Sequence, residues 1–237
     1  MASTSATATS ITVQTTLPRL PLPELSVLRT ERLLLRPFAK DDLQALYALR
    51  KLPAFMAESS LGKADDNITE TQAALADLLK PSKPHFVFGI FIAAMGELIG
   101  DGGVHTVVGT SLGWPEIGYK LHPAHWGRGY ATEAMGAILK AWWELSREGA
   151  EVAVHPSTLP LQTEGEEGGE GEGEGEKKSV VSREHVSAEI AAYNTGSQRV
   201  LEKLGFRNIG SWEEPDTQLH RLGQPLMLGH YVLECPS

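Results

Sequence analysis

The stretch EIGYKLHPAHWGRGYATEAM, which runs from Glu116 to Met135, determines how the rest of the chain is interpreted. Its first residues have the composition of a short β-strand that ends near His122. A loop with two glycines follows. Beyond Tyr130, apolar residues recur at spacings of three or four, which is the pattern of an amphipathic helix. The stretch therefore predicts a strand, a glycine loop and a helix in direct succession.

The glycine loop has the features of an anion site. The first backbone N–H groups of a helix lack partners within the helix, and the helix dipole favours negative charge there. Gly127 and Gly129 would let the main chain approach a phosphate without an intervening Cβ, and Arg128 adds positive charge. A pyrophosphate site is one interpretation and an ordinary tight turn is the other. No P-loop pattern and no complete G-x-G-x-x-G pattern is present, so two other nucleotide-binding loops are not favoured.

Strands and helices are predicted on both sides of this stretch. Strands are predicted at 31–38, 85–93, 98–108, 115–123, 186–193, 206–212 and 225–234. One helix is predicted to start at Asp41 or Asp42, and two others are predicted at 69–80 and 197–204. A fourth helix is predicted to start at Tyr130, with Arg147 in its last turn and Gly149 just beyond its end. This order predicts one mixed α/β domain over residues 28–237.

Two segments are expected to lie outside the packed domain. Residues 1–27 are rich in Ser and Thr and are predicted to be a disordered tail. An insertion at about 156–182 contains the run TEGEEGGEGEGEGE (Thr163 to Glu176), which has nothing apolar to bury. The run carries seven glutamates, and therefore most of the formal net charge of −9. Metal binding by this run is an alternative, although carboxylates without rigid spacing make a poor fixed cage.

Composition argues against several functional classes. No apolar stretch reaches about 18 residues, so no transmembrane helix and no membrane partner is expected. No basic stripe suggests nucleic acid. The single cysteine, Cys235, fits a reducing compartment, and we expect a cytoplasmic protein. The histidines show no metal-ligand spacing, so no metal site is predicted.

Three motifs resemble the GNAT superfamily of N-acetyltransferases. The glycine loop is similar to its acetyl-CoA motif [QR]-x-x-G-x-[GA], with Trp126 in the Gln/Arg position followed by Gly129 and Ala131. TERLLLRPFAKDD, which begins at Thr30, and YNTGSQRVLEKLGF, which begins at Tyr193, resemble the RimJ/RimL-like branch, named after ribosomal-protein N-terminal acetyltransferases. The resemblance implies a central, mostly antiparallel sheet flanked by helices.

The resemblance also implies a reaction and a set of cofactor contacts. It implies acetyl transfer from acetyl-CoA to a primary amine, which belongs to a protein N-terminus or to a small molecule. The amine would attack the thioester directly while both substrates are bound. The protein would be a monomer or a homodimer. The implied cofactor contacts are Leu121, His122, Trp126, Gly127, Arg128, Gly129, Tyr130, Ala131, Thr132, Asn194 and Ser197. Amides of 127–131 would hold the pyrophosphate, and the Leu121 amide would face the thioester carbonyl. Helix capping is the alternative role for Asn194 and Ser197.

The catalytic groups are predicted less directly. Glu189 is the first candidate for the general base, because the family places a glutamate there in some members and the surrounding strand is apolar. An exposed strand face is its alternative, and Glu116 is the second candidate. The resemblance places the general acid at a tyrosine, but this chain has Leu201 there, which leaves Tyr193, Tyr130 or solvent. A catalytically silent CoA-binding protein and an interaction protein that uses the acidic insertion are the competing hypotheses.

Overall fold

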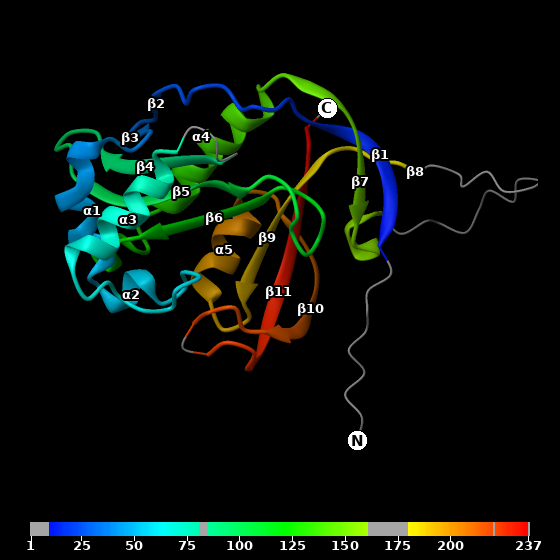
Figure 1. Ribbon diagram of the computed structural model, residues 1–237. Coiled ribbons are helices and arrows are strands. Elements are labelled where there is room, and N and C mark those ends of the chain that lie inside the picture. The colour runs from blue at the N-terminus through cyan, green and yellow to red at the C-terminus, as the bar shows by residue number, and fades with distance from the viewer. Residues whose placement is uncertain (1–9, 81–84, 161–179, 220, 237) are drawn as a thin grey trace, which may run out of the picture.

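The computed structural model describes residues 10–80, 85–160, 180–219 and 221–236, and these residues form two β-sheets (Figure 1). The larger sheet has eight strands in the order β10-β11-β9-β6-β5-β4-β3-β2. In chain order they are β2 (Leu28–Arg29), β3 (Leu33–Arg36), β4 (Phe86–Ile92), β5 (Leu98–Thr106), β6 (Glu116–Leu121), β9 (His185–Ala191), β10 (Arg207–Pro215) and β11 (Pro225–Glu234). All neighbours are antiparallel except β6 and β9, which are parallel. The expected mixed, mostly antiparallel sheet is confirmed.

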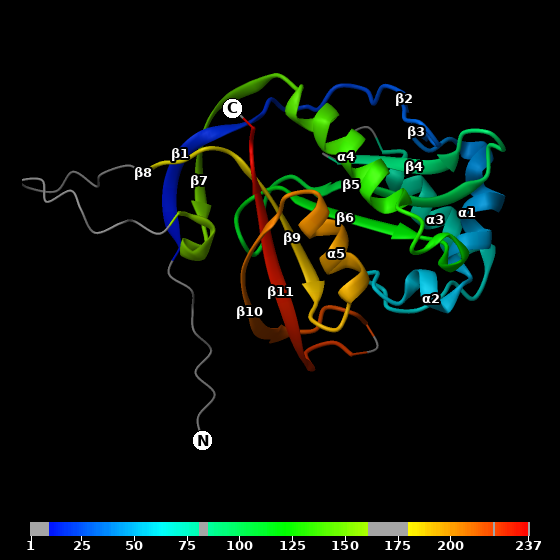
Figure 2. The same ribbon diagram turned by 180° about the vertical axis from the view of Figure 1, so that it is seen from behind.

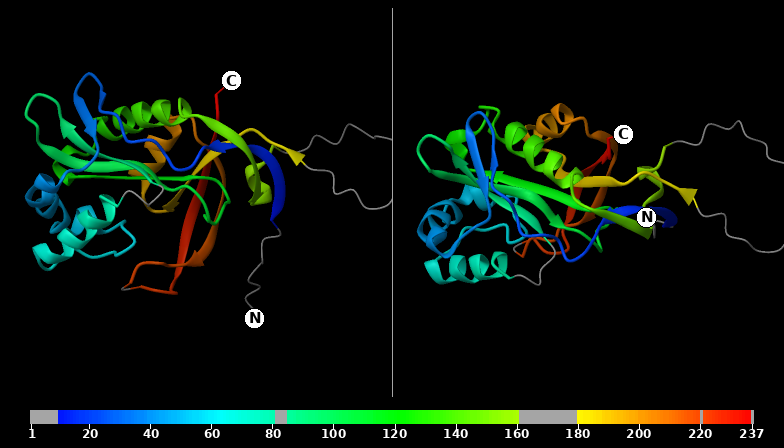
Figure 3. Two further views of the ribbon diagram at one scale, coloured as in Figure 1. Left: turned by 45° about the horizontal axis from the view of Figure 1, so that its top comes forward. Right: turned by 90° about the horizontal axis from the view of Figure 1, so that it is seen from above.

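Helices cover both faces of this sheet (Figure 3). Helices α4 (Tyr130–Trp143) and α5 (Thr195–Lys203) lie on one face, in front of the strands in Figure 2. The other face carries α1 (Leu43–Arg50), α2 (Pro53–Met56) and α3 (Ile68–Leu78). Each face has its own apolar core because side chains alternate along a strand. Leu33 and Leu35 of β3 pack in the core beneath α4, whereas Leu34 packs in the core beneath α1.

The parallel strands β6 and β9 touch only where they begin. Their ladder consists of the pair Glu116 and Ser187, and the amide of Ser187 donates to the carbonyl of Pro115 at 2.7 Å. Beyond that pair the strands separate, as Figure 1 shows for the green β6 and the yellow β9. The gap opens toward their carboxyl ends, where the glycine loop follows β6 and α5 follows β9. This divergence positions the candidate site.

The smaller sheet corrects two boundaries of the sequence analysis. It consists of β7 (Arg147–Val154), β1 (Ile11–Pro18) and β8 (Val180–Val181), in that order. Residues expected in the tail therefore form β1, and β8 lies inside the expected insertion, as does the short 3₁₀ helix η3 (Pro156–Thr158). The physical reason is a small apolar core around Val13, Trp114 and Val154. The Gly/Glu run itself lies outside the described residues, as do residues 1–9.

The end of α4 is also corrected. The helix ends at Trp143, and the residues expected in its last turn begin β7 instead. Arg147 still serves the helix end, because its guanidinium donates to the carbonyls of Trp142 and Leu145 at 2.8 and 2.7 Å. It also pairs with the buried carboxylate of Glu184 at 2.7 Å. The two further 3₁₀ helices are η1 (Lys40–Asp42) and η2 (Pro123–His125).

We predict that Val13→Ala destabilises the protein, whereas Gln14→Ala does not. Val13 is fully buried in the core of the small sheet, and Gln14 is its exposed neighbour on the same strand. Removing two buried methyl groups costs about 2 kcal/mol of unfolding free energy. Urea unfolding of both variants measures the difference. Equal midpoints would show that residues of β1 do not contribute to stability in solution.

Candidate active site

Backbone conformation at the glycine loop requires glycine. Gly127 and Gly129 have φ angles of +70° and +82°, in the left-handed region that side chains disfavour. Gly129 is the N-cap of α4, and no side chain caps the helix from this position. The first amides of α4, at Tyr130, Ala131 and Thr132, are therefore available to an anion.

The loop has room for a phosphate group. A Cβ built on Gly127 would meet no atom within 4 Å, so open space lies beside the main chain there. The amides, the positive end of the helix dipole and the neighbouring Arg128 together fit a pyrophosphate. The structure therefore places together the loop residues that the sequence predicted.

Sequence reasoning missed the group that braces this loop. Glu133, in the first turn of α4, accepts hydrogen bonds from the Thr30 hydroxyl at 2.6 Å and the Arg32 amide at 2.9 Å. The Arg32 guanidinium pairs with the same carboxylate at 2.6 Å and donates to the carbonyl of Arg128 at 3.0 Å. Burial opposes ionisation of Glu133, but the bonds from Thr30 and Arg32 outweigh it and hold its pKa below the ordinary value. Two of its partners, Thr30 and Arg32, belong to the TER sequence at the start of the motif TERLLLRPFAKDD, which was the signal in the sequence for this contact.

The end of β6 is fixed by the loop that follows it. The indole Nε1 of Trp126 donates to the carbonyl of Leu121 at 2.7 Å. His122 donates its amide to Ile99 at 2.7 Å and accepts the Ala124 amide on its Nδ1 at 3.0 Å. The His122 imidazole is thus held within its own loop.

Main-chain amides of β6 face the opening between the parallel strands. Successive peptide groups of a strand point to opposite edges. Because the His122 amide points to β5, the amides of Leu121 and Tyr119 point toward β9. The ladder with β9 stops at Glu116, so these amides lie beyond it.

Asn194 is the N-cap of α5, which starts at Thr195. The Asn194 side chain accepts the Ser197 amide at 3.1 Å and caps the helix. Ser197 lies inside the first turn, so the alternative that it is the N-cap is wrong, and its predicted contact with the cofactor stays a prediction. Its carbonyl accepts the Tyr119 hydroxyl at 3.2 Å, which ties β6 to α5. Leu201, at the position where the family has a tyrosine, is fully buried.

The two tyrosines considered as general acids have other partners. The Tyr193 hydroxyl donates to Glu58 at 3.2 Å, and burial together with Glu58 raises its pKa. The guanidinium of Arg32 lies 4.5 Å from the ring centre of Tyr130, on the loop side of α4. Neither arrangement distinguishes one of them as a proton donor.

Glu189 lies on the sheet face opposite α4. Val186 and Ala188 of β9 pack in the core beneath α4, so the alternating Ser187 and Glu189 point to the other face. The Glu189 side chain is 16% exposed and accepts the hydroxyl of Ser111. Burial raises its pKa to about 8, with further contributions from the carboxylates of Glu116 and Glu214.

Several titratable groups gather around Glu189. Glu116 at the start of β6 also has a raised pKa, first because of burial and then because of Glu214. Glu214 of β10 and His230 of β11 complete the group, and one ligand atom each of Glu189, Glu214 and His230 lies within 4.8 Å of the others. Hydrogen bonds to Glu189 from Ser111 and to Glu214 from His230 account for this arrangement, so we assign no metal to it. Both predicted carboxylates are brought together, whereas Glu214 and His230 were missed.

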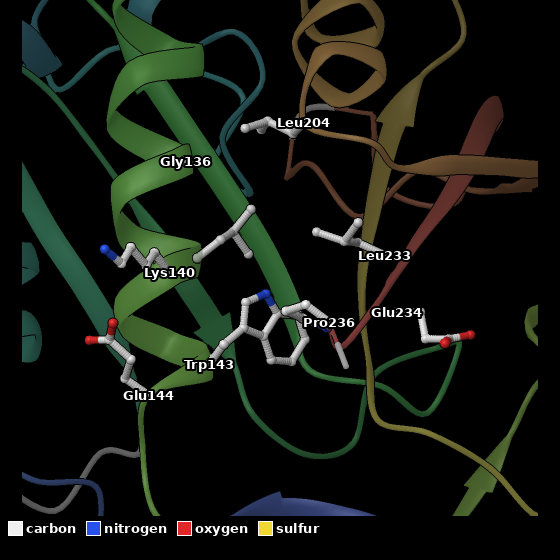
Figure 4. A pocket seen from close by; sticks show the side chains of 9 residues that line it. Gly136, Lys140, Trp143, Glu144, Leu204, Leu233, Glu234 and Pro236 are labelled. Atoms are coloured by element: carbon white, nitrogen blue, oxygen red, sulfur yellow. The ribbon is translucent and has the colours of Figure 1, made fainter.

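A groove lies beside α4 (Figure 4). It has a volume of about 510 Å³ and lies between α4, Leu204 after α5 and the end of β11. Its lining includes Trp143, Leu204 and Leu233. On α4 it starts at Gly136, about 9 Å along the helix from Tyr130 at 1.5 Å per residue. The groove therefore belongs neither to the glycine loop nor to the carboxylates.

Known proteins share this architecture and sequence. Residues 32–207 match the sequence profile of the acetyltransferase (GNAT) domain. The chain is 30% identical over 195 residues to the probable N-acetyltransferase YjcK of Bacillus subtilis strain 168. This match covers 78% of this chain and 85% of YjcK. The chain therefore belongs to the GNAT acetyltransferase family. It is an acetyl-CoA-dependent N-acetyltransferase, and the silent and interaction-protein alternatives are not favoured.

Solved structures confirm the fold. A GNAT-family acetyltransferase from Bacillus anthracis superposes with a TM-score of 0.60 at 19% identity, over 88% of this chain and 98% of that chain. Spermidine N-acetyltransferase from Vibrio cholerae, in complex with CoA and spermine, superposes with a TM-score of 0.57 at 14% identity, over 87% and 97%. Within the described residues, every helix is too short or too polar to cross a membrane.

We predict that Gly129→Ala lowers stability and weakens acetyl-CoA binding, while Gly136→Ala in the same helix does neither. Gly129 needs a left-handed backbone, so alanine there costs about 1–2 kcal/mol. A Cβ on Gly136 would only meet Leu204 at 3.7 Å, and alanine favours the helix. Thermal unfolding with and without acetyl-CoA measures both effects. A Gly129→Ala protein that matches wild type would contradict the assigned backbone conformation.

Proposed function

We propose that this protein transfers an acetyl group from acetyl-CoA to a primary amine by direct attack in a ternary complex, with Glu189 as general base. The observation that carries the proposal is the position of Glu189. It is a largely buried carboxylate on β9, the strand that diverges from β6, and its pKa is raised to about 8. A general base is most effective when its pKa is near the working pH.

The glycine loop and the edge of β6 would hold the cofactor. The amides of 127–131 fit the pyrophosphate, with Thr132 next in the first turn, and the Leu121 amide faces the opening along which the pantetheine arm would extend. Trp126 and His122 would act by fixing the loop, as their hydrogen bonds indicate. From the α5 side, Asn194 would contact the cofactor with the NH2 group of its side chain, and Ser197 would contact it with its hydroxyl.

Each reaction step then has a protein group or solvent assigned to it. Acetyl-CoA supplies the acetyl group as a thioester. Glu189 would accept one proton from the ammonium nitrogen, so that the free amine forms the N–C bond while the C–S bond breaks, and the second proton that the nitrogen loses as the amide forms would pass to solvent. The Leu121 amide would donate to the carbonyl oxygen as it gains charge. With Leu201 in place of a tyrosine, solvent would protonate the thiolate.

The acceptor would be a cationic amine. Glu116, Glu189 and Glu214 lie on the same face, and a positive acceptor would relieve the repulsion among them. A protein N-terminus is one candidate, in keeping with the RimJ/RimL-like motifs. A polyamine is another, because the Vibrio cholerae structure of the same fold holds spermine. Free-thiol release with a peptide N-terminus, spermidine and an amino sugar would rank them.

We predict that Glu189→Gln lowers kcat by about 10²–10⁴-fold and leaves the affinity for acetyl-CoA unchanged. The amide has the shape of the carboxylate but cannot accept the proton. Glu116→Gln should cost much less, because Glu116 lies where the strands are still paired. The exposed Glu202→Gln serves as the control. Full activity of Glu189→Gln would remove Glu189 from the reaction.

We also expect acetyl-CoA, but not NAD, to raise the thermal midpoint. A ligand at about 100 times its Kd stabilises a protein by roughly 2.7 kcal/mol, which corresponds to about 5–10 °C for a chain of this size. Differential scanning fluorimetry measures the shift. An equal response to NAD, or no response to either compound, would contradict the cofactor assignment of the glycine loop.

A further inference from the structure

A buried histidine lies directly across the sheet from Glu189. His230 of β11 is the register partner of Glu189 on β9, so both side chains emerge on the same face. The His230 side chain is fully buried. Its Nε2 lies 3.1 Å from a carboxylate oxygen of Glu214 and 3.9 Å from a carboxylate oxygen of Glu189. The same ring nitrogen therefore faces two carboxylates.

Aromatic stacking fixes the orientation of this ring. Trp212 lies parallel to His230, with ring centres 3.5 Å apart and an angle of 7° between the planes. The imidazole of His155 also stacks on Trp212, with ring centres 5.1 Å apart and an angle of 20° between the planes. The Trp212 indole also donates to the Glu214 oxygen that His230 contacts, at 2.7 Å. The ring and its carboxylate partner are thus held by the same residue.

We propose that His230 is a positioning residue for Glu189: its Nε2–H stands between the carboxylates of Glu189 and Glu214 and keeps Glu189 available as a proton acceptor. The inference rests on the proposed function, since it concerns the same base. An N–H facing two carboxylate oxygens is attractive to both, whereas an unprotonated nitrogen would repel both. Burial lowers the pKa of His230, and Glu214 partly offsets this effect. Because an ionised carboxylate can only accept, the ring nitrogen that faces the two carboxylates is the one placed to carry the proton.

The charged groups around the pair are contributed by every neighbouring strand. Glu189 faces Glu116 of β6, Glu214 of β10 and His230 of β11. The titratable groups around His230 are Glu189, Glu214 and His155. The two carboxylates of Glu116 and Glu214 oppose ionisation of Glu189, and the His230 N–H favours it.

Variants that remove one or the other of these effects should therefore shift the titration of Glu189 in opposite directions. His230→Phe keeps a ring to stack on Trp212 but removes the N–H, so ionised Glu189 faces Glu214 without a donor between them. The titration of Glu189 should then move to higher pH. Glu214→Gln removes a like charge, so the titration should move to lower pH. His230→Gln retains an N–H donor and should stay near wild type.

The test is a titration of the glutamate side-chain carbon by ¹³C NMR on the full-length protein, with the Glu189 signal assigned by its loss in Glu189→Gln. Titration requires no acceptor amine, so it does not depend on identifying the substrate. We expect shifts of about half a pH unit or more, upward for His230→Phe and downward for Glu214→Gln. The pH dependence of kcat with one amine, compared across the same variants, should move in parallel.

The outcomes separate this inference from the proposed function. An unchanged Glu189 titration in His230→Phe, or one that moves to lower pH, overturns the positioning role. If His230→Phe does not fold, an unchanged or upward-shifted titration in the partly exposed Glu214→Gln overturns it instead. Full turnover by Glu189→Gln would overturn the general base itself, whatever the titrations show.

Discussion

The site depends on the early end of the pairing between β6 and β9. Neighbouring strands in a sheet normally satisfy each other's main-chain groups along their length. Here the parallel ladder is limited to Glu116 and Ser187, so the β6 amides beyond it face an opening. A strand edge in this state recognises a partner that supplies its own acceptors. The glycine loop at the end of β6 and α5 at the end of β9 then lie on either side of the same opening.

Electrostatics divides the site into two halves. On the face that carries α4, the unpaired first amides of this helix and its dipole favour an anion. The carboxylate of Glu133 could otherwise compete with that anion, but Thr30 and Arg32 hold it by a hydrogen bond and an ion pair. On the opposite face, burial raises the pKa of Glu189 and of Glu116, and neighbouring carboxylates raise both further. The charges therefore favour an anion on the face that carries α4 and a cation on the opposite face of the same sheet.

The sequence predicted the features that depend on local patterns. Two glycines and a 3.6-residue period are enough to place the loop and α4, and a family motif points to Glu189. The partners of Glu189 are different in kind: Glu214 and His230 reach it only through the register of three strands, and a shift of one residue would turn them to the other face. The strand β1 was missed for a related reason, because its partner β7 lies more than 100 residues away and its Ser/Thr-rich composition resembles a tail.

The small sheet and the candidate site are physically connected. Trp114, in the core of the small sheet, donates to the hydroxyl of Thr158 in η3 at 3.0 Å, and Arg207 of β10 donates to the carbonyl of the same residue at 3.1 Å. His155, which precedes η3, stacks on Trp212 and through it on His230. The segment that looked like the start of a linker therefore forms part of the packing that fixes the ring beside Glu189. The strand β7 leads into this segment, and among the described strands it pairs only with β1. Pairing with β1 is therefore connected through β7 to the packing beside Glu189.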